Sequence, residues 1–185
     1  HREISEVIFS GGDPLMANDD HLAWLVEKIE QIPHVSRLRI HSRLPVVIPS
    51  RITAKLVRLL KYSRLKATMV LHINHPNEIN QELIDSLEPL RAARIPLFNQ
   101  SVLLRGVNDD AQVLINLSEA LFDAGIQPYY LHLFDAVQGA AHFDIPEADA
   151  VAIVKSMLAS LPGFLMPKLV REIAGQANKT PINLA

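Results

Sequence analysis

The residues whose types and spacing suit chemistry lie where apolar runs of strand type end. The first such place is Ser10-Gly11-Gly12-Asp13-Pro14, which directly follows Val7-Ile8-Phe9. Glycines reach backbone angles that other residues avoid and let a ligand approach the main chain closely. Asp13 adds a carboxylate beside exposed backbone N–H groups. The turn can therefore hold a small polar molecule, although a tight strand-to-helix turn without a ligand fits the same residues, since glycine motifs match often by chance.

Polar side chains end the other apolar runs in the same way. In parallel α/β folds the C-terminal ends of the strands gather on one face, and active sites are built there. Polar residues at every strand end favour one shared ligand cavity. The alternative is a set of ordinary solvated loop residues, because strand-to-helix turns are polar in any case. The set consists of Ser10, Asp13, Ser42, Arg43, His72, Gln100, Asp135 and Glu172.

Four of the candidate side chains indicate particular chemistry. Arg43 can clamp a carboxylate or a phosphate with paired hydrogen bonds, or form a surface salt bridge. Asp135 and Glu172 would select a cationic group if they face one cavity. Lys179, in a loop after the last predicted strand, can form an imine with a carbonyl cofactor such as pyridoxal phosphate. A solvated surface lysine is the alternative for that position.

Composition limits the other function classes. Hydrophobic residues make up 49% of the 185 residues and the formal net charge is -2, so we expect a buried core and neither a nucleic-acid nor a membrane surface. No apolar run is long enough for a bilayer and no export signal is present, so the cytoplasm is the expected location. Without cysteine, these residues form no disulfide and hold no cysteine-bound iron–sulfur cluster. The histidine pairs His72/His75 and His132/His142 lack spaced carboxylates, so we expect no metal site here.

Alternating strand and helix patterns predict the architecture. Such alternation implies right-handed βαβ units and a parallel sheet. We therefore expect an α/β fold, a partial (βα) barrel with outer helices formed by residues 1–185 as one domain, with an open doubly wound sheet as second choice. Pro89 should kink or shorten its helix, and residues 44–49 should be extended. The expected strands are 7–9, 37–41, 66–71, 95–98, 127–133 and 166–170; the expected helices are about 19–32, 53–62, 80–93, 110–124 and 146–161.

Several long motifs in order resemble the lysine 2,3-aminomutase family, whose members are radical S-adenosylmethionine enzymes that also use pyridoxal phosphate. The resemblance runs from about residue 5 to the end of the chain. Residues 137–143 and 167–172 resemble the short bacterial branch that acts in β-lysylation of elongation factor P. The motifs are Ser10–Leu15, Arg39–Val47, His72–Ile79, Asn99–Leu104 and Pro128–Leu131.

The resemblance implies a role for each candidate residue. Asp135 and Glu172 match the two acids that hold the ε-ammonium group of L-lysine, and Lys179 matches the lysine that bonds to pyridoxal phosphate. The family usually has Asp at the position of Glu172, and a glycine-rich run where this chain has 175–178. The positions that match S-adenosylmethionine-binding residues are Ser10, Gly11, Gly12, Asp13, Ser42, Arg43, His72 and Gln100.

The family's three-cysteine motif for a 4Fe-4S cluster is absent from these residues. We expect it upstream of His1, so that the chain is the C-terminal part of a barrel without its first βα unit and shows no turnover alone. The expected partners are L-lysine and enzymes of the elongation factor P pathway; the exposed sheet edge favours association, and a homo-oligomer remains open. The alternatives are a catalytically incomplete cofactor-binding fragment and a Schiff-base aldolase-type barrel.

Overall fold

The computed structural model describes residues 1–135, 139–173, 175–176 and 178–184. Val137 and Gln138 of the 137–143 motif, and Ala177, lie outside the described residues. The chain divides into two compact units, one of His1–His72 with Asn80–Phe98 and one of Ile73–Ile79 with Asn99–Ala185. The chain passes between the units more than once. That the residues form one domain stays a prediction, and each unit is described by itself.

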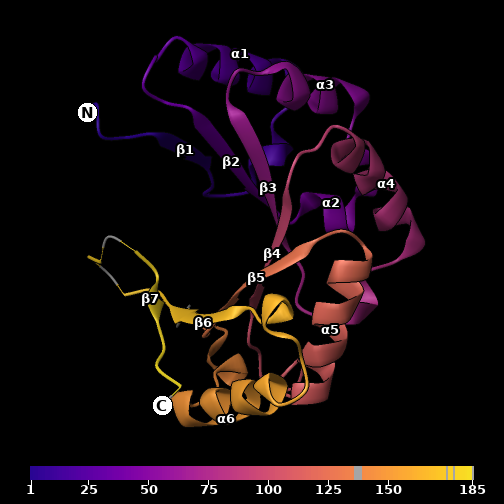
Figure 1. The fold of residues 1–185 in the computed structure, drawn as a ribbon, viewed down its shortest axis with the longest axis vertical. Coiled ribbons are helices and arrows are strands. Elements are labelled where there is room, and N and C mark those ends of the chain that lie inside the picture. The colour runs from indigo at the N-terminus through magenta and orange to yellow at the C-terminus, as the bar shows by residue number, and fades with distance from the viewer. Residues whose placement is uncertain (136–138, 174, 177, 185) are drawn as a thin grey trace. The chain divides into compact units, whose positions relative to one another are not determined.

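In the described part of the chain, seven strands follow one another in the sheet in sequence order, β1-β2-β3-β4-β5-β6-β7 (Figure 1). The pairs β1–β2, β2–β3 and β5–β6 are parallel. The last pair, β6–β7, is antiparallel, with Arg171 opposite Thr180. Strands adjacent in sequence and joined by helices are the arrangement that the alternating pattern predicts.

In the first unit, helices cover one side of β1 to β3. Leu38 and Ile40 on β2 are buried and alternate with partly exposed Arg39 and His41, which is the period-two pattern of a strand with one face in a core. The main elements are β1 (Glu6–Phe9), α1 (Asp19–Glu30), β2 (Arg37–Ser42), α3 (Ala54–Tyr62), β3 (Lys66–His72) and α4 (Gln81–Ala92). Asn18, Thr53 and Asn80 cap the three helices, each accepting a backbone N–H with its side-chain oxygen.

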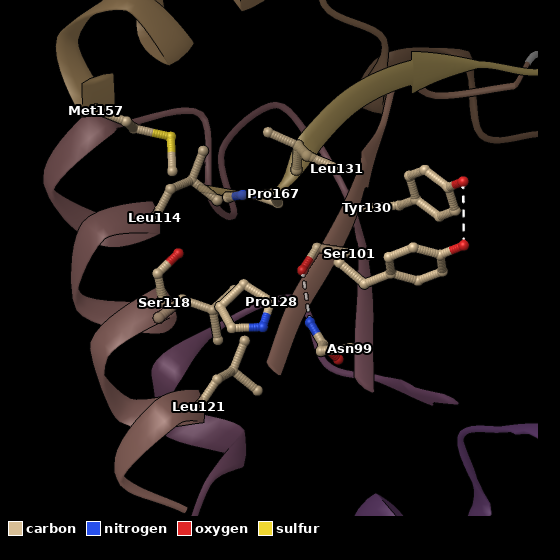
Figure 2. Close-up of a pocket in the computed structure, with 12 residues that line it drawn as sticks. Asn99, Ser101, Leu114, Ser118, Leu121, Pro128, Tyr130, Leu131, Met157 and Pro167 are labelled. Carbon is tan, nitrogen blue, oxygen red and sulfur yellow. Dashed lines mark hydrogen bonds between the residues drawn. The ribbon is translucent and has the colours of Figure 1, made fainter. Parts of the chain in front are cut away.

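The second unit packs two helices with the later strands. Its elements are the single turn η3 (Pro76–Glu78), most of β4 (Leu97–Val102), α5 (Ala111–Asp123), β5 (Gln127–His132), η4 (Ala141–Phe143), α6 (Glu147–Leu158), η5 (Gly163–Leu165), β6 (Lys168–Arg171) and β7 (Thr180–Pro181). Asp110 caps α5, and Gly125 follows that helix with a φ of 74°. Leu114, Leu121 and Met157 are buried and line a small cavity beside β5 (Figure 2).

A buried polar network fixes the segment after β3 to β4 in this unit. Asn99 accepts a hydrogen bond from the Ile73 backbone N–H at 2.9 Å, and the Ser101 hydroxyl donates to the Ile73 carbonyl at 2.7 Å. Fully buried Asn108 donates to the carbonyls of Asn74 and Val102 at 2.8 and 2.9 Å. Buried amides are costly unless their hydrogen bonds are satisfied. Asn99 and Ser101 therefore stabilise the fold by holding the backbone of Ile73 against β4.

The structure corrects two expected elements. Residues 44–49 are not extended: they contain the short helix α2 (Leu44–Val47), in which Pro45 lies in the first turn, where its missing N–H costs nothing. The helix α4 is not shortened at Pro89 but continues to Ala92, because Pro89 lies in its last turn. Within the described residues, no helix is long and apolar enough to cross a membrane.

Candidate functional site

The Asp13 carboxylate ties the glycine turn to the end of β2. Its Oδ1 accepts hydrogen bonds from the Leu15 backbone N–H at 3.0 Å and from the buried Ser42 hydroxyl at 2.6 Å. Its Oδ2 accepts from the backbone N–H groups of Arg43 and Leu44 at 2.7 and 2.9 Å. Asp13 therefore caps α2 from a distant part of the sequence, and both of its oxygens are occupied. The structure favours a positioning role for Asp13 and Ser42 at the predicted S-adenosylmethionine site.

The same contacts set the protonation of Asp13. Burial raises its pKa, but the hydrogen bonds from Ser42, Leu15, Arg43 and Leu44 together lower it below its ordinary value. Since the pKa is lower in the folded chain than in the unfolded chain, the stabilisation is complete above the unfolded pKa of about 3.9. It is lost as the pH falls through the folded pKa.

We expect Asp13→Asn to lower the free energy of unfolding by about 2 kcal/mol at pH 7, because the amide cannot accept all four hydrogen bonds. Urea unfolding of the chain measures this difference. Below about pH 4 the wild type should approach the variant, since its own carboxyl becomes protonated. Glu27→Gln, at an exposed position of α1 in the same unit, should change stability by less than about 0.5 kcal/mol at either pH. A constant difference between wild type and Asp13→Asn from pH 7 to pH 3 would contradict the assignment.

The glycine turn leaves its backbone accessible. Gly11 and Gly12 have φ values of 84° and 59°, which favour glycine, and no heavy atom lies within 4 Å of the positions that their Cβ atoms would take. Arg43 donates to the His72 carbonyl at 2.8 Å, so two of the predicted positions meet at the ends of β2 and β3. The edge of His72 meets the ring of His41, with centroids 6.0 Å apart.

Gln100 belongs to the second unit and does not follow its strand. The sequence places it after a strand that ends at Phe98, but β4 continues to Val102, so Gln100 lies inside the strand. Its neighbours Asn99 and Ser101 are buried and point to one face, while Gln100 is partly exposed on the other. That alternation places the framework residues of this motif on one face of the strand and Gln100 on the other.

Asp135 and Glu172 line one hollow of about 530 Å³ in the second unit. Asp144 and Glu147 line it too, and Arg171, which forms an ion pair with Glu147, is its one basic residue among the described lining. The remaining carboxylates give the hollow a negative potential. A hollow of this kind suits a small ligand that carries a positive charge.

Lys179 lies at the neighbouring hollow of about 240 Å³, which Glu172, Ile173, Gln176 and Asn178 also line. It comes directly before β7, and its amine forms an ion pair with the Glu172 carboxylate. The Lys179 side chain is 23% exposed, so its amine is held against the protein rather than extended into solvent. Glu172 borders both hollows and so connects the predicted cofactor lysine to the acidic hollow.

Comparison with known proteins shows which proteins the chain is similar to. It is 59% identical to L-lysine 2,3-aminomutase of Haemophilus influenzae over 180 residues, which is 97% of this chain and 53% of that protein. The chain belongs to the lysine 2,3-aminomutase family. It is also 55% identical to the Escherichia coli L-lysine 2,3-aminomutase over 184 residues (100% of this chain, 54% of that protein) and 39% identical to that of Clostridium subterminale over 180 residues (97% and 43%). No protein-family model matches the chain.

The chain spans about half the length of the curated lysine 2,3-aminomutases that it matches. Solved structures confirm the expected fold class. A radical SAM methyltransferase from Sphaerobacter thermophilus superposes with a TM-score of 0.65 at 12% identity over 91% of this chain and 51% of that one. A domain of pyruvate-formate lyase-activating enzyme from Bacteroides vulgatus gives 0.60 at 13% identity over 90% and 98%. The fold is the α/β partial barrel of radical S-adenosylmethionine proteins.

Membership of this family implies S-adenosylmethionine, an iron–sulfur cluster and pyridoxal phosphate. The open backbone at Gly11 and Gly12 fits a polar ligand such as S-adenosylmethionine, and the Lys179 amine beside a hollow fits pyridoxal phosphate. The cluster does not fit, because none of the 185 residues is a cysteine. Among the described residues, no group of three or more His, Cys, Asp and Glu is placed to hold a metal ion.

Sequence reasoning missed two features of the first unit. His41 contacts His72, and Arg39 forms an ion pair with Glu6 at 2.8 Å, with side chains only 19% and 31% exposed. A usable signal existed, because Arg39 and His41 alternate with the buried residues of β2 and so share one face of the sheet.

Proposed function

We propose that the chain carries the substrate-binding and cofactor-binding residues of an L-lysine 2,3-aminomutase, an isomerase that converts L-lysine to β-lysine. The observation that carries this proposal is the shared position of Asp135 and Glu172 on one acidic hollow, with Lys179 paired to Glu172 at the adjoining hollow. A pair of carboxylates selects a cationic side chain, and the amine beside them supplies an attachment point for a carbonyl cofactor.

Each residue in this proposal has one task. Asp135 and Glu172 bind the ε-ammonium group of lysine and so set the position of the reacting carbons. Lys179 would hold pyridoxal phosphate through its amine, and the cofactor would supply the carbonyl group to which an amine bonds. In the first unit, the Ser10–Asp13 turn, Ser42, Arg43 and His72 bind S-adenosylmethionine, with Asp13 and Ser42 holding the turn in place. Positioning of this kind lowers the barrier by fixing reactants in a reactive geometry.

The bound cofactors supply the radical chemistry of the amino-group shift from the α-carbon to the β-carbon. The cluster that generates the radical would be held by cysteines outside these 185 residues, and on that basis the 185 residues alone are expected to show no turnover. The motif at 167–172 further supports the branch that supplies β-lysine to elongation factor P.

A hybrid enzyme tests the proposal. In it, this chain replaces the matching 180 residues of the Haemophilus influenzae L-lysine 2,3-aminomutase. With cluster, S-adenosylmethionine and pyridoxal phosphate supplied, we expect the hybrid to form β-lysine from L-lysine at a rate within about tenfold of the parent. Chromatography of derivatised amino acids measures this. A folded hybrid that makes no β-lysine, beside an active parent prepared in parallel, would end the proposal.

The branch assignment has its own test. The product should serve as donor for modification of purified elongation factor P by its ligase, detected as a mass increase of the intact factor. Borohydride trapping of a sugar-like carbonyl at a lysine of the chain, without pyridoxal phosphate, would instead favour an aldolase-type barrel.

A further inference from the structure

Two groups from different strands hold the Lys179 amine. The Glu172 carboxylate, which follows β6, forms an ion pair with it. The ring of Tyr130, on β5, lies beneath it, with Nζ 5.8 Å from the ring centroid. This distance is within the range at which an ammonium group is attracted to the face of an aromatic ring. The proposed function gives Tyr130 no role.

The position of the Tyr130 ring is itself fixed. Its hydroxyl hydrogen-bonds the Tyr129 hydroxyl at 3.1 Å, and the two rings are 3.8 Å apart (Figure 2). The ring of His132, buried at the end of β5, meets Tyr130 edge-on at 5.8 Å. Tyr130 is therefore held by its neighbours and presents a fixed face to Lys179.

Strand pairing places the backbone of Lys179 beside the end of β6. Tyr130 is opposite Lys168 in the parallel pair β5–β6, and Arg171 is opposite Thr180 in the antiparallel pair β6–β7. One residue further along the two strands, Lys179 comes opposite Glu172. The short β7 thus fixes the backbone of Lys179, while Tyr130 and Glu172 fix its side chain.

We propose that Tyr130 is a positioning residue for Lys179, and this rests on the proposed function of Lys179 in bonding pyridoxal phosphate. A free lysine side chain samples many rotamers, and this freedom is lost when the amine bonds to a cofactor. A residue that already restricts the amine lowers the cost of that ordering. Tyr130 does so through its aromatic face; its hydroxyl only helps to hold the ring, which the ring contacts with Tyr129 and His132 also do.

The test compares Tyr130 variants in the hybrid enzyme. Tyr130→Leu and Tyr130→Met remove the aromatic face, and Tyr130→Phe keeps it. We expect the first two to weaken pyridoxal phosphate binding about tenfold and the third to change it less than about twofold. Absorbance titration gives the affinity, and borohydride reduction with peptide mass analysis gives the fraction of cofactor on Lys179. Tyr62→Leu is the matched control, because the Tyr62 ring also lies 5.3 Å from a lysine amine, that of Lys61, but in the other unit.

The outcomes distinguish the positioning role of Tyr130 from the proposed function of Lys179. Wild-type binding by both Tyr130→Leu and Tyr130→Met would overturn the positioning role, as would an equal loss in Tyr130→Phe. Misfolding of both variants, seen in unfolding midpoints, would also overturn it, since it would assign Tyr130 to the core. If the hybrid bonds the cofactor at a lysine other than Lys179, the proposed function falls; if bonding at Lys179 is normal in all variants, only this inference falls.

Discussion

Replacing Lys179 by alanine is expected to abolish covalent bonding of pyridoxal phosphate to the hybrid enzyme, and β-lysine formation with it. The amine lies against the Tyr130 ring and the Glu172 carboxylate beside a hollow of about 240 Å³, and alanine removes the nucleophile while leaving the hollow. The absorbance band of lysine-bound cofactor should disappear, and borohydride should label no peptide that contains position 179. The residual rate should be at least about a thousandfold lower, as for other lost covalent groups.

Lys168→Ala is the matched control for this loss. Lys168 lies on β6 in the same unit and is exposed, but it lines neither hollow. We expect normal cofactor bonding and activity from this variant. Survival of the absorbance band in Lys179→Ala, or its loss in Lys168→Ala, would show that the attachment point is elsewhere.

Periodicity alone predicted the greater part of the fold. The strands β1 to β6 and the helices α1, α3, α4, α5 and α6 lie within a few residues of their expected bounds, because buried residues recur at strand or helix spacing along each of these helices and most of these strands. The caps Thr53 and Asp110 lie at the expected starts of α3 and α5, since capping is a local interaction.

Some elements could not be predicted from the sequence, mainly because they depend on interactions between residues that are far apart in it. The helix at Leu44–Val47 depends on a cap from Asp13, about thirty positions earlier, and no local pattern reports that contact. The strand at Thr180–Pro181 is only two residues long and exists because β6 offers it an edge. The shortening expected at Pro89 does not occur, since α4 continues through it to Ala92; the effect of a proline depends on its distance from the helix end, and helix ends are hard to place from sequence.

The motifs that carry the family resemblance combine two kinds of residue. In Asn99-Gln100-Ser101 the outer two bind backbone groups of Ile73, while Gln100 lies on the opposite face. Asp13 and Ser42 likewise bind the framework, whereas the backbone of Gly11 and Gly12 is open. The sequence cannot separate these groups, because a framework amide and a ligand-binding amide look the same until the strand faces are known.

Neutralising both acids of the larger hollow is expected to remove the preference of the hybrid for lysine over norleucine, which has no ε-ammonium group. Hydrogen bonds to a charged group contribute about 1.5–3 kcal/mol each, so Asp135→Asn with Glu172→Gln should weaken lysine binding by about two to four orders of magnitude. Norleucine binding should change less than about threefold. Titration of the cofactor-loaded hybrid, followed by absorbance, measures both affinities, and Glu119→Gln, at an exposed position of α5, is the control.

The single variants separate the two hollows, because only Glu172 borders both. Asp135→Asn should weaken lysine binding while leaving the bonding of pyridoxal phosphate at Lys179 unchanged. Glu172→Gln removes a partner of the substrate and also the ion-pair partner of Lys179, so it should weaken both. If Asp135→Asn impaired cofactor bonding as strongly as Glu172→Gln, or if neither variant altered the preference for lysine, the acidic hollow would not be the site of the substrate ammonium group.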